Sequence, residues 1–205
     1  MAFLNEDDRV RIGAAIADAE RRTSGELVTV IAPMADDYLY IPALWAALCA
    51  LLLPGILLLA GGVVSLEEMY LYQVGLFVAM AVIFRWPPLL IRLIPRGVRM
   101  QRARRLAREQ FYQQHLHRTE GGTGVLLFVS VAEHHVEIIA DHGIDSVVPP
   151  GFWQGVVDDF TAQLRAGQVA EGFLHAIAAC GDLLAERFPV SADDRNELPN
   201  RLVEL

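Results

Sequence analysis

The chain has 205 residues, of which 54% are hydrophobic, and its mean hydropathy is +0.34. All 17 basic residues are arginine, and 25 acidic residues give a formal net charge of −8. This balance excludes an overall basic field of the kind that attracts nucleic acid, so no nucleic-acid partner is expected. The hydrophobic excess is concentrated between residues 41 and 94, which indicates an integral membrane protein rather than a soluble one.

The first segment, residues 1–38, predicts the opening of a soluble α/β domain. Residues 3–22 place apolar side chains at mixed spacings of three and four between charges, which is typical of an amphipathic helix, and Asn5 is the expected N-cap. Residues 26–31, rich in branched side chains, predict a β-strand that ends at Pro33. No apolar signal core precedes the helix, so we expect the N-terminus to start in the cytoplasm.

Residues 39–96 predict a transmembrane helical hairpin. Residues 41–64 contain no charge and are long enough, at 1.5 Å per residue, to cross about 30 Å of hydrocarbon. Tyr38, Tyr40 and Trp45 are typical of the aromatic belt at a membrane interface. The second span is expected at 69–91 if it continues through Pro87 and Pro88; the alternative is a shorter span that starts in a thinned bilayer.

Arginine placement predicts the orientation of the hairpin. The loop between the two runs, residues 65–68, has no arginine, whereas eight arginines lie between residues 85 and 108 and four precede the first run. The positive-inside rule therefore places both termini and the soluble domain in the cytoplasm, at the inner membrane. The basic stretch has two interpretations, which are a topology signal with a solvated helix face, or a segment that lies along an anionic leaflet.

Residues 97–190 predict the second part of the soluble domain. A helix should continue past Arg108 to Leu116, followed by a glycine-rich break at 120–124. Strands at 125–131 and 136–141 form an expected hairpin with a short connection, and helices at 151–166 and 169–188 follow. The polar, acidic residues 191–205 are expected to form a flexible tail.

The stretches Thr123–Ser130 and His135–Ile144, together with the sequence TSGELVTVI at 23–31, resemble the TPM domain family, formerly a domain of unknown function. The resemblance covers residues 3–34 and about 103–188. It implies an α/β/α layered domain with a small β-sheet, interrupted here by the two-helix transmembrane hairpin. In that arrangement the strand at 26–31 pairs with the strand hairpin despite the insertion.

The family includes a thylakoid protein of photosystem II repair, for which acid phosphatase activity has been proposed, and bacterial proteins that bind calcium. In these relatives the domain lies outside the cytoplasm beside a single anchor. The arginine count of this chain instead predicts a cytoplasmic domain that the anchor interrupts.

Carboxylates near the predicted strand ends are the candidate metal ligands. They are Glu26 at the start of the first strand, Asp141 at the end of the last, and Asp158 in the next helix, beside Asp159. Hard cations such as Ca²⁺ take six to eight oxygen ligands, so Ca²⁺ is the ion that this set would hold. No DxDxDG spacing is present, and the alternative is that these residues are solvated charges on amphipathic elements.

Five histidines fall between residues 115 and 142, but none has the spacing of a zinc site, so we expect loop and cap histidines. The chain also lacks a nucleophile elbow and a P-loop. Two functions stay open at this point. One is a membrane-tethered interaction or assembly and repair module with a protein partner at the bilayer, and the other is a divalent-metal-dependent phosphatase that uses Glu26, Asp141 and Asp158.

Overall fold

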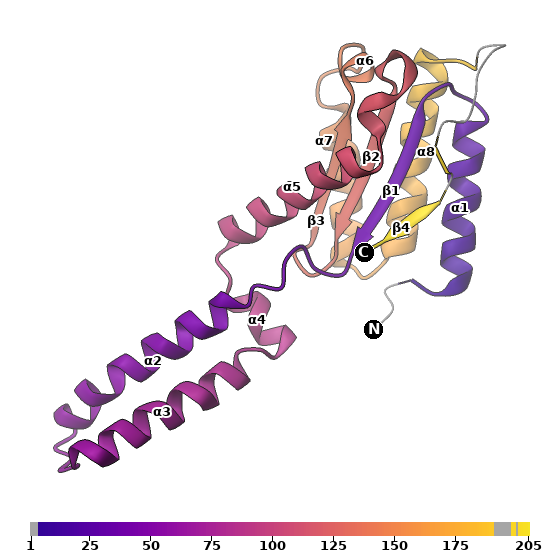
Figure 1. Cartoon of the computed structure of the whole chain (residues 1–205). Helices are drawn as coiled ribbons and strands as arrows, with labels where there is room; N and C mark the ends of the chain where they lie inside the picture. Colours follow the sequence, from indigo (N-terminus) through magenta and orange to yellow (C-terminus); the bar gives the residue numbers. More distant parts are fainter. Residues whose placement is uncertain (1–3, 191–197, 200) are drawn as a thin grey trace. The chain divides into compact units, whose positions relative to one another are not determined.

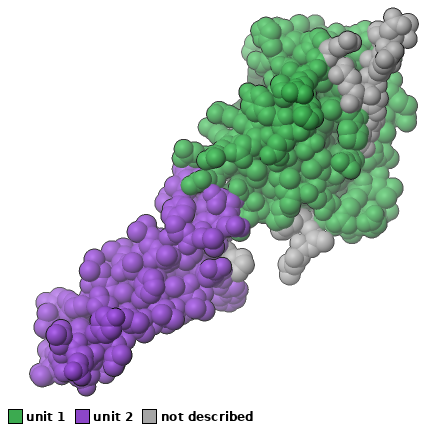
Figure 2. Space-filling model, viewed as in Figure 1, with its two compact units in different colours: residues 1–35, 100–205 green, residues 36–99 purple. Residues whose placement is uncertain are grey.

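The structure is a computed structural model that describes residues 4–190, 198–199 and 201–205. The chain forms two compact units, coloured separately in Figure 2. The first unit joins residues 1–35 to residues 100–205, and the second contains residues 36–99. Segments from both sides of the insertion therefore build one domain.

A four-stranded mixed sheet is the centre of the first unit, with strand order β3-β2-β1-β4 (Figure 1). The strands are β1 (Glu26–Ala32), β2 (Gly124–Ser130), β3 (His135–Ala140) and β4 (Leu202–Glu204). β1 runs parallel to β2 from the pair Glu26 and Gly124 onward, and β2 and β3 form an antiparallel hairpin. The predicted pairing of the first strand with the strand hairpin is confirmed.

Helices cover both faces of the sheet, as Figure 1 shows. On one face α1 (Glu6–Glu20), α7 (Phe152–Arg165) and α8 (Val169–Arg187) pack against the larger apolar core, and on the other face α5 (Arg96–Gln113) packs against the smaller one. Alternate strand residues point to opposite faces. Leu27, Ile31 and Val125 enter the first core, whereas Val28 and Leu126 enter the second. The predicted α/β/α layered fold is confirmed.

Local sequence explains where α1 begins. The Asn5 side chain accepts a hydrogen bond from Asp8 N at 2.7 Å, and Asp8 accepts one from Asn5 N at 3.1 Å, which completes a capping box. Asn5 is thus the N-cap that the sequence predicted. The buried stripe of α1 contains Ile12, Ile16 and Ala19, at helical spacing.

The expectation of a flexible tail over 191–205 is wrong for its last residues. Residues 191–197 and 200 lie outside the described residues, but β4 pairs in parallel with β1, and Leu205 N donates to Ile31 O at 3.1 Å. Without β4, the outer edge of β1 would leave a row of backbone groups unpaired. Arg9 of α1 also forms an ion pair with Glu204, at 2.5 Å between Nε and Oε1.

The second unit contains α2 (Tyr40–Leu59), α3 (Leu66–Ile83) and α4 (Pro87–Leu93). α2 and α3 pair as a helical hairpin, and both are long and apolar enough to cross a membrane, with mean hydropathies of 2.3 and 1.4. The prediction of one continuous second span that reaches residue 91 is wrong, because α3 ends at Ile83 and a separate helix, α4, begins at Pro87. Trp86 adopts an extended conformation with ψ 122°, as a residue before proline prefers.

Candidate functional site

Glu26 and Asp141 lie at the same end of the sheet, on either side of the start of β2. Glu26 is paired with Gly124 in the parallel ladder, and Asp141 N donates to Gly124 O at 2.8 Å. The Cα atoms of the two acidic residues are therefore about two strand spacings apart, roughly 9.5 Å. A carbonyl and side-chain atoms of Leu116 lie directly over Gly124, within 3.1 Å of where its Cβ would be.

Glycine-rich turns enclose this end of the sheet. The short helices η1 (Leu116–Arg118) and η2 (Glu120–Gly122) precede β2, and α6 (His142–Asp145) follows β3. A Cβ at Gly143 would lie 2.3 Å from Gly121 O and 2.7 Å from Gly122 O, so only glycine allows the two backbones to approach this closely. A Cβ at Gly122 would meet the Asp141 carboxylate at 3.6 Å.

Asp141 and Asp158 have local partners on their own elements. Asp141 is the N-cap of α6, and its Oδ1 accepts from His142 N at 2.7 Å. Asp158 lies on the exposed side of α7, where its Oδ1 accepts from Gln154 Nε2 at 2.8 Å. Within the part of the chain that the structure describes, no three His, Cys, Asp or Glu side chains are placed to hold one metal ion. The structure thus brings Glu26 and Asp141 to one end of the sheet without joining Asp158 to them in a three-ligand group.

The histidines fall mostly where the sequence predicted them. His115 and His134 adopt positive φ angles in turns, and His142 begins α6. The exception is His135, which opens β3 and is buried, so it is a sheet residue rather than a loop residue.

Glu20 is a carboxylate near the start of β1, at the same end of the sheet as Glu26, and the sequence did not single it out as a site residue. Its Oε1 accepts from Leu27 N at 3.3 Å, and among the described residues its buried Oε2 has no hydrogen-bond partner. Burial is the main cause that raises the pKa of Glu20 to about 8; the nearby negative charge of Glu26 acts in the same direction, and the hydrogen bond from Leu27 N opposes both. An acidic residue in the last turn of an amphipathic helix usually faces solvent, so its sequence position carried no signal.

The raised pKa of Glu20 predicts a pH dependence of stability. Between pH 4.5 and about 8 the folded chain holds a proton that the unfolded chain has lost, so the free energy of unfolding should fall as the pH rises through this window. Glu20→Gln should remove this decline and be more stable than the wild type above pH 8. Urea midpoints across the window measure the effect, and Glu109→Gln on α5 is the control for loss of an exposed charge. A decline of the same slope in Glu20→Gln would contradict the assignment.

A second group of polar residues is buried at the opposite end of the β2–β3 hairpin. Glu133 accepts hydrogen bonds from Ala35 N, at 3.1 Å to Oε1 and 3.2 Å to Oε2, and from the Ser130 hydroxyl. His135 and Glu137 follow on β3 and are joined by a contact of 2.9 Å between Nε2 and Oε2. Ser130 and His135 are cross-strand partners, but the serine donates its hydrogen to Glu133.

This arrangement is typical of a structural polar network, because the buried Glu133 carboxylate accepts hydrogen bonds from both the Ser130 hydroxyl and the Ala35 amide. The Glu133 carboxylate instead fixes Ala35, the last residue of the first chain segment, to the turn after β2. The network therefore stabilises the point where the chain leaves the sheet.

Comparison with known proteins identifies the fold. Residues 93–183 match the family model described as the TPM domain. The NMR structure of the BA42 protein from the psychrophilic bacterium Bizionia argentinensis is similar in fold, with a TM-score of 0.61 at 21% sequence identity, covering 99% of this chain and 96% of that one. A search of curated proteins gave no match. As the resemblance of its strand hairpin implied, residues 93–183 are similar to the TPM domain.

Proposed function

We propose that this chain is an inner-membrane protein in which α2 and α3 cross the bilayer and hold the TPM domain at the cytoplasmic face, as an interaction or assembly module. The observation that carries this proposal is α3, an apolar helix of 18 residues without one buried residue. Large apolar side chains such as Leu71 and Val82 are each 67% exposed. A helix that is apolar on all sides and uncovered requires an apolar environment from outside the chain.

Element lengths support a bilayer as that environment. α2, with 20 residues, and α3, with 18, extend about 30 Å and 27 Å along their axes. The hydrocarbon core of a bilayer is about 30 Å thick. Between the two helices, the turn at 60–65 contains no charge, and the Ser65 capping box with Glu68 starts α3 cleanly.

Reporter fusions test the topology. We expect a green fluorescent protein fused after Leu205 to fluoresce, and alkaline phosphatase fused after Glu67 to be active, because arginines flank the hairpin on the outside of both helices and none lies in the connecting turn. Alkaline phosphatase activity from a fusion at Leu205 would place the domain on the other side. Release of the full chain from membranes by alkaline carbonate would refute the spanning hairpin itself.

A divalent-metal-dependent phosphatase is the second candidate, and the shared position of Glu26 and Asp141 beside Gly124 favours it. If the two carboxylates bind Ca²⁺, the ion should raise the melting temperature, with a gain of about 2.7 kcal/mol at one hundred times the dissociation constant. Asp141→Asn should abolish that gain and keep the metal-free stability, because asparagine caps a helix as well as aspartate does. A melting temperature that is the same with and without Ca²⁺ or Mg²⁺ would mean that Asp141 is only a capping residue, and it would exclude this candidate.

A further inference from the structure

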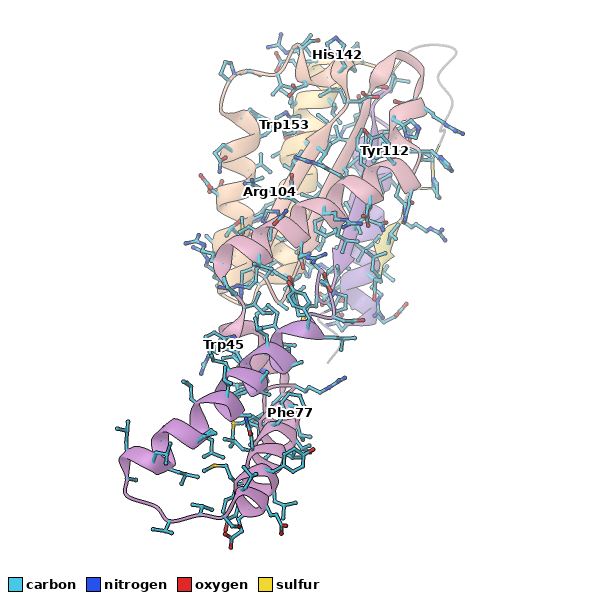
Figure 3. All side chains as sticks on the ribbon, turned by 60° about the vertical axis from the view of Figure 1, so that its left-hand side comes forward. Trp45, Phe77, Arg104, Tyr112, His142 and Trp153 are labelled. Carbon is cyan, nitrogen blue, oxygen red and sulfur yellow. The ribbon has the colours of Figure 1, made fainter. Side chains whose placement is uncertain are left out.

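We infer that the outer face of α5 binds the phosphate headgroups of anionic phospholipids in the leaflet from which the hairpin emerges. This inference rests on the proposed membrane anchoring and adds to it a lipid class and a binding surface. We define the arginine face as the exposed side of α5 that contains Arg104, Arg105 and Arg108. Arg104 is labelled on α5 in Figure 3.

Charge is distributed very unevenly along the chain. Residues 84–108 contain eight arginines and no acidic residue, whereas the rest of the chain has nine arginines against all 25 acidic residues. The stretch is therefore a local region of charge +8 in a protein whose net charge is −8. Such a region attracts an anionic surface even though the whole chain does not.

The packing of α5 separates this charge from the domain core. Its buried residues, Ala103, Ala107, Gln110 and Phe111, recur at helical spacing and face the sheet. Gln101, Arg104, Arg105 and Arg108 are exposed and are neighbours at spacings of three and four. The arginine face is thus open to a ligand while the opposite stripe fixes the helix to the domain.

Arginines on α1 and the flanking turn differ from Arg104 and Arg108, because ion pairs with distant parts of the chain hold them. Arg9, Arg11 and Arg22 each contact a carboxylate from a distant part of the chain, at 2.5–2.8 Å, and these contacts raise the pKa of each guanidinium. Within residues 4–190, 198–199 and 201–205, no ion pair involves Arg104 or Arg108. Arg105 contacts only its own helix, through Glu109 at 2.8 Å.

Arginine suits a phosphate partner because its planar guanidinium can donate two parallel hydrogen bonds to phosphate oxygens. One turn beyond Arg108 lies Tyr112, which is labelled in Figure 3 and is 61% exposed. Its ring rests edge-on against His117, with 5.2 Å between ring centroids. Exposed tyrosines beside basic residues are typical of surfaces at the headgroup level. α5 also begins at Arg96, thirteen residues after α3 ends at Ile83, so the chain itself holds it near the bilayer.

A topology signal alone would act only during insertion, so the test must report on the folded, inserted chain. We would place a nitroxide at Gln101→Cys in a Cys49→Ala background, because Cys180 is fully buried and burial raises the pKa of its thiol to about 12. The full chain is reconstituted in nanodiscs of phosphatidylcholine alone, or with about 30% phosphatidylglycerol as the anionic lipid. The electron paramagnetic resonance spectrum of the nitroxide gives the ratio of immobilised to mobile label.

We expect immobilisation in phosphatidylglycerol discs only, and its loss in about 1 M salt, which shortens the Debye length to about 3 Å. Each arginine near an anionic leaflet contributes about fivefold in surface occupancy, so Arg104→Gln/Arg108→Gln should lower the ratio by about 25-fold. The double variant Arg165→Gln/Arg201→Gln removes the same charge from exposed positions outside α5 and should keep the wild-type ratio. Inorganic phosphate added to phosphatidylcholine discs should leave the label mobile, because the proposed ligand is the phosphate of an anionic lipid and not free phosphate.

An equal ratio in the two kinds of disc would overturn the lipid assignment, and so would an equal loss in the control variant. If the arginine face binds an acidic protein partner instead of lipid, the ratio should be equal in the two kinds of disc. Failure of the chain to enter nanodiscs at all would contradict the proposed anchoring rather than the arginine face, so the two failures are distinguishable.

Discussion

A fragment of residues 100–205, without residues 1–35, is expected not to fold cooperatively. The missing segment supplies β1, which lies between β2 and β4, so its loss leaves β2 with an open edge and β4 without a partner. Among the core side chains that it supplies, six large ones with at most 4% exposure are Ile12, Ile16, Leu27, Val28, Val30 and Ile31. At about 1.5–3 kcal/mol each, their burial contributes roughly 9–18 kcal/mol. That contribution is comparable to the whole stability of an ordinary domain, about 5–15 kcal/mol.

The control is a chain in which only the second unit is removed. Residues 1–35 joined to residues 100–205 by about ten Gly/Ser residues keep every strand and both cores, and such a linker spans roughly 17 Å. We expect this chain to be monomeric and to unfold in one transition by circular dichroism in urea. A fragment of residues 100–205 that is itself monomeric with a single sharp transition would show that the domain is not divided by the hairpin.

Periodicity in the sequence was sufficient to predict most of this fold. The Asn5 cap and the apolar stripes of α7 and α8 are local patterns, and the expected bounds of α7 and α8 are each within one residue of the observed ones. The two strands of the hairpin could be placed because their apolar runs are separated by a short polar turn.

Long-range pairing explains what the sequence could not predict. β4 has only three residues and follows a polar, acidic segment, so only the open edge of β1 makes residues 202–204 a strand. Glu20 was missed for a similar reason, since its burial depends on how α1 packs at the start of β1 rather than on its neighbours in sequence. The Glu133 network likewise joins residues about one hundred positions apart.

The metal-ligand prediction shows the limit of strand-end reasoning. Acidic residues at the ends of neighbouring strands do meet at one edge, as Glu26 and Asp141 do. The sequence did not predict that Asp141 would cap α6, or that Leu116 would lie over Gly124. Asp158 is exposed and accepts a hydrogen bond from Gln154, as expected from the alternative in which it is a solvated charge on an amphipathic helix.

Gly143→Ala is expected to be the most damaging single substitution at this end of the sheet. The new Cβ would lie 2.3 Å from Gly121 O and 2.7 Å from Gly122 O, and both are backbone atoms that cannot rotate away as a side chain can. Relief requires α6 to separate from η2, which should cost about 1–3 kcal/mol or more. The urea midpoint of the hairpin-deleted chain measures the loss.

Gly155→Ala is the matched control, because it makes the same chemical change within α7, where a Cβ meets no atom within 4 Å. Alanine in an open helix interior is more stable than glycine by about 0.5–1 kcal/mol, so the two substitutions should shift the midpoint in opposite directions. If Gly143→Ala also displaces Asp141, the Ca²⁺-induced gain should disappear together with stability, whereas Gly155→Ala should keep any gain. A Gly143→Ala chain as stable as the wild type would mean that η2 and α6 do not approach as closely as their backbone positions require.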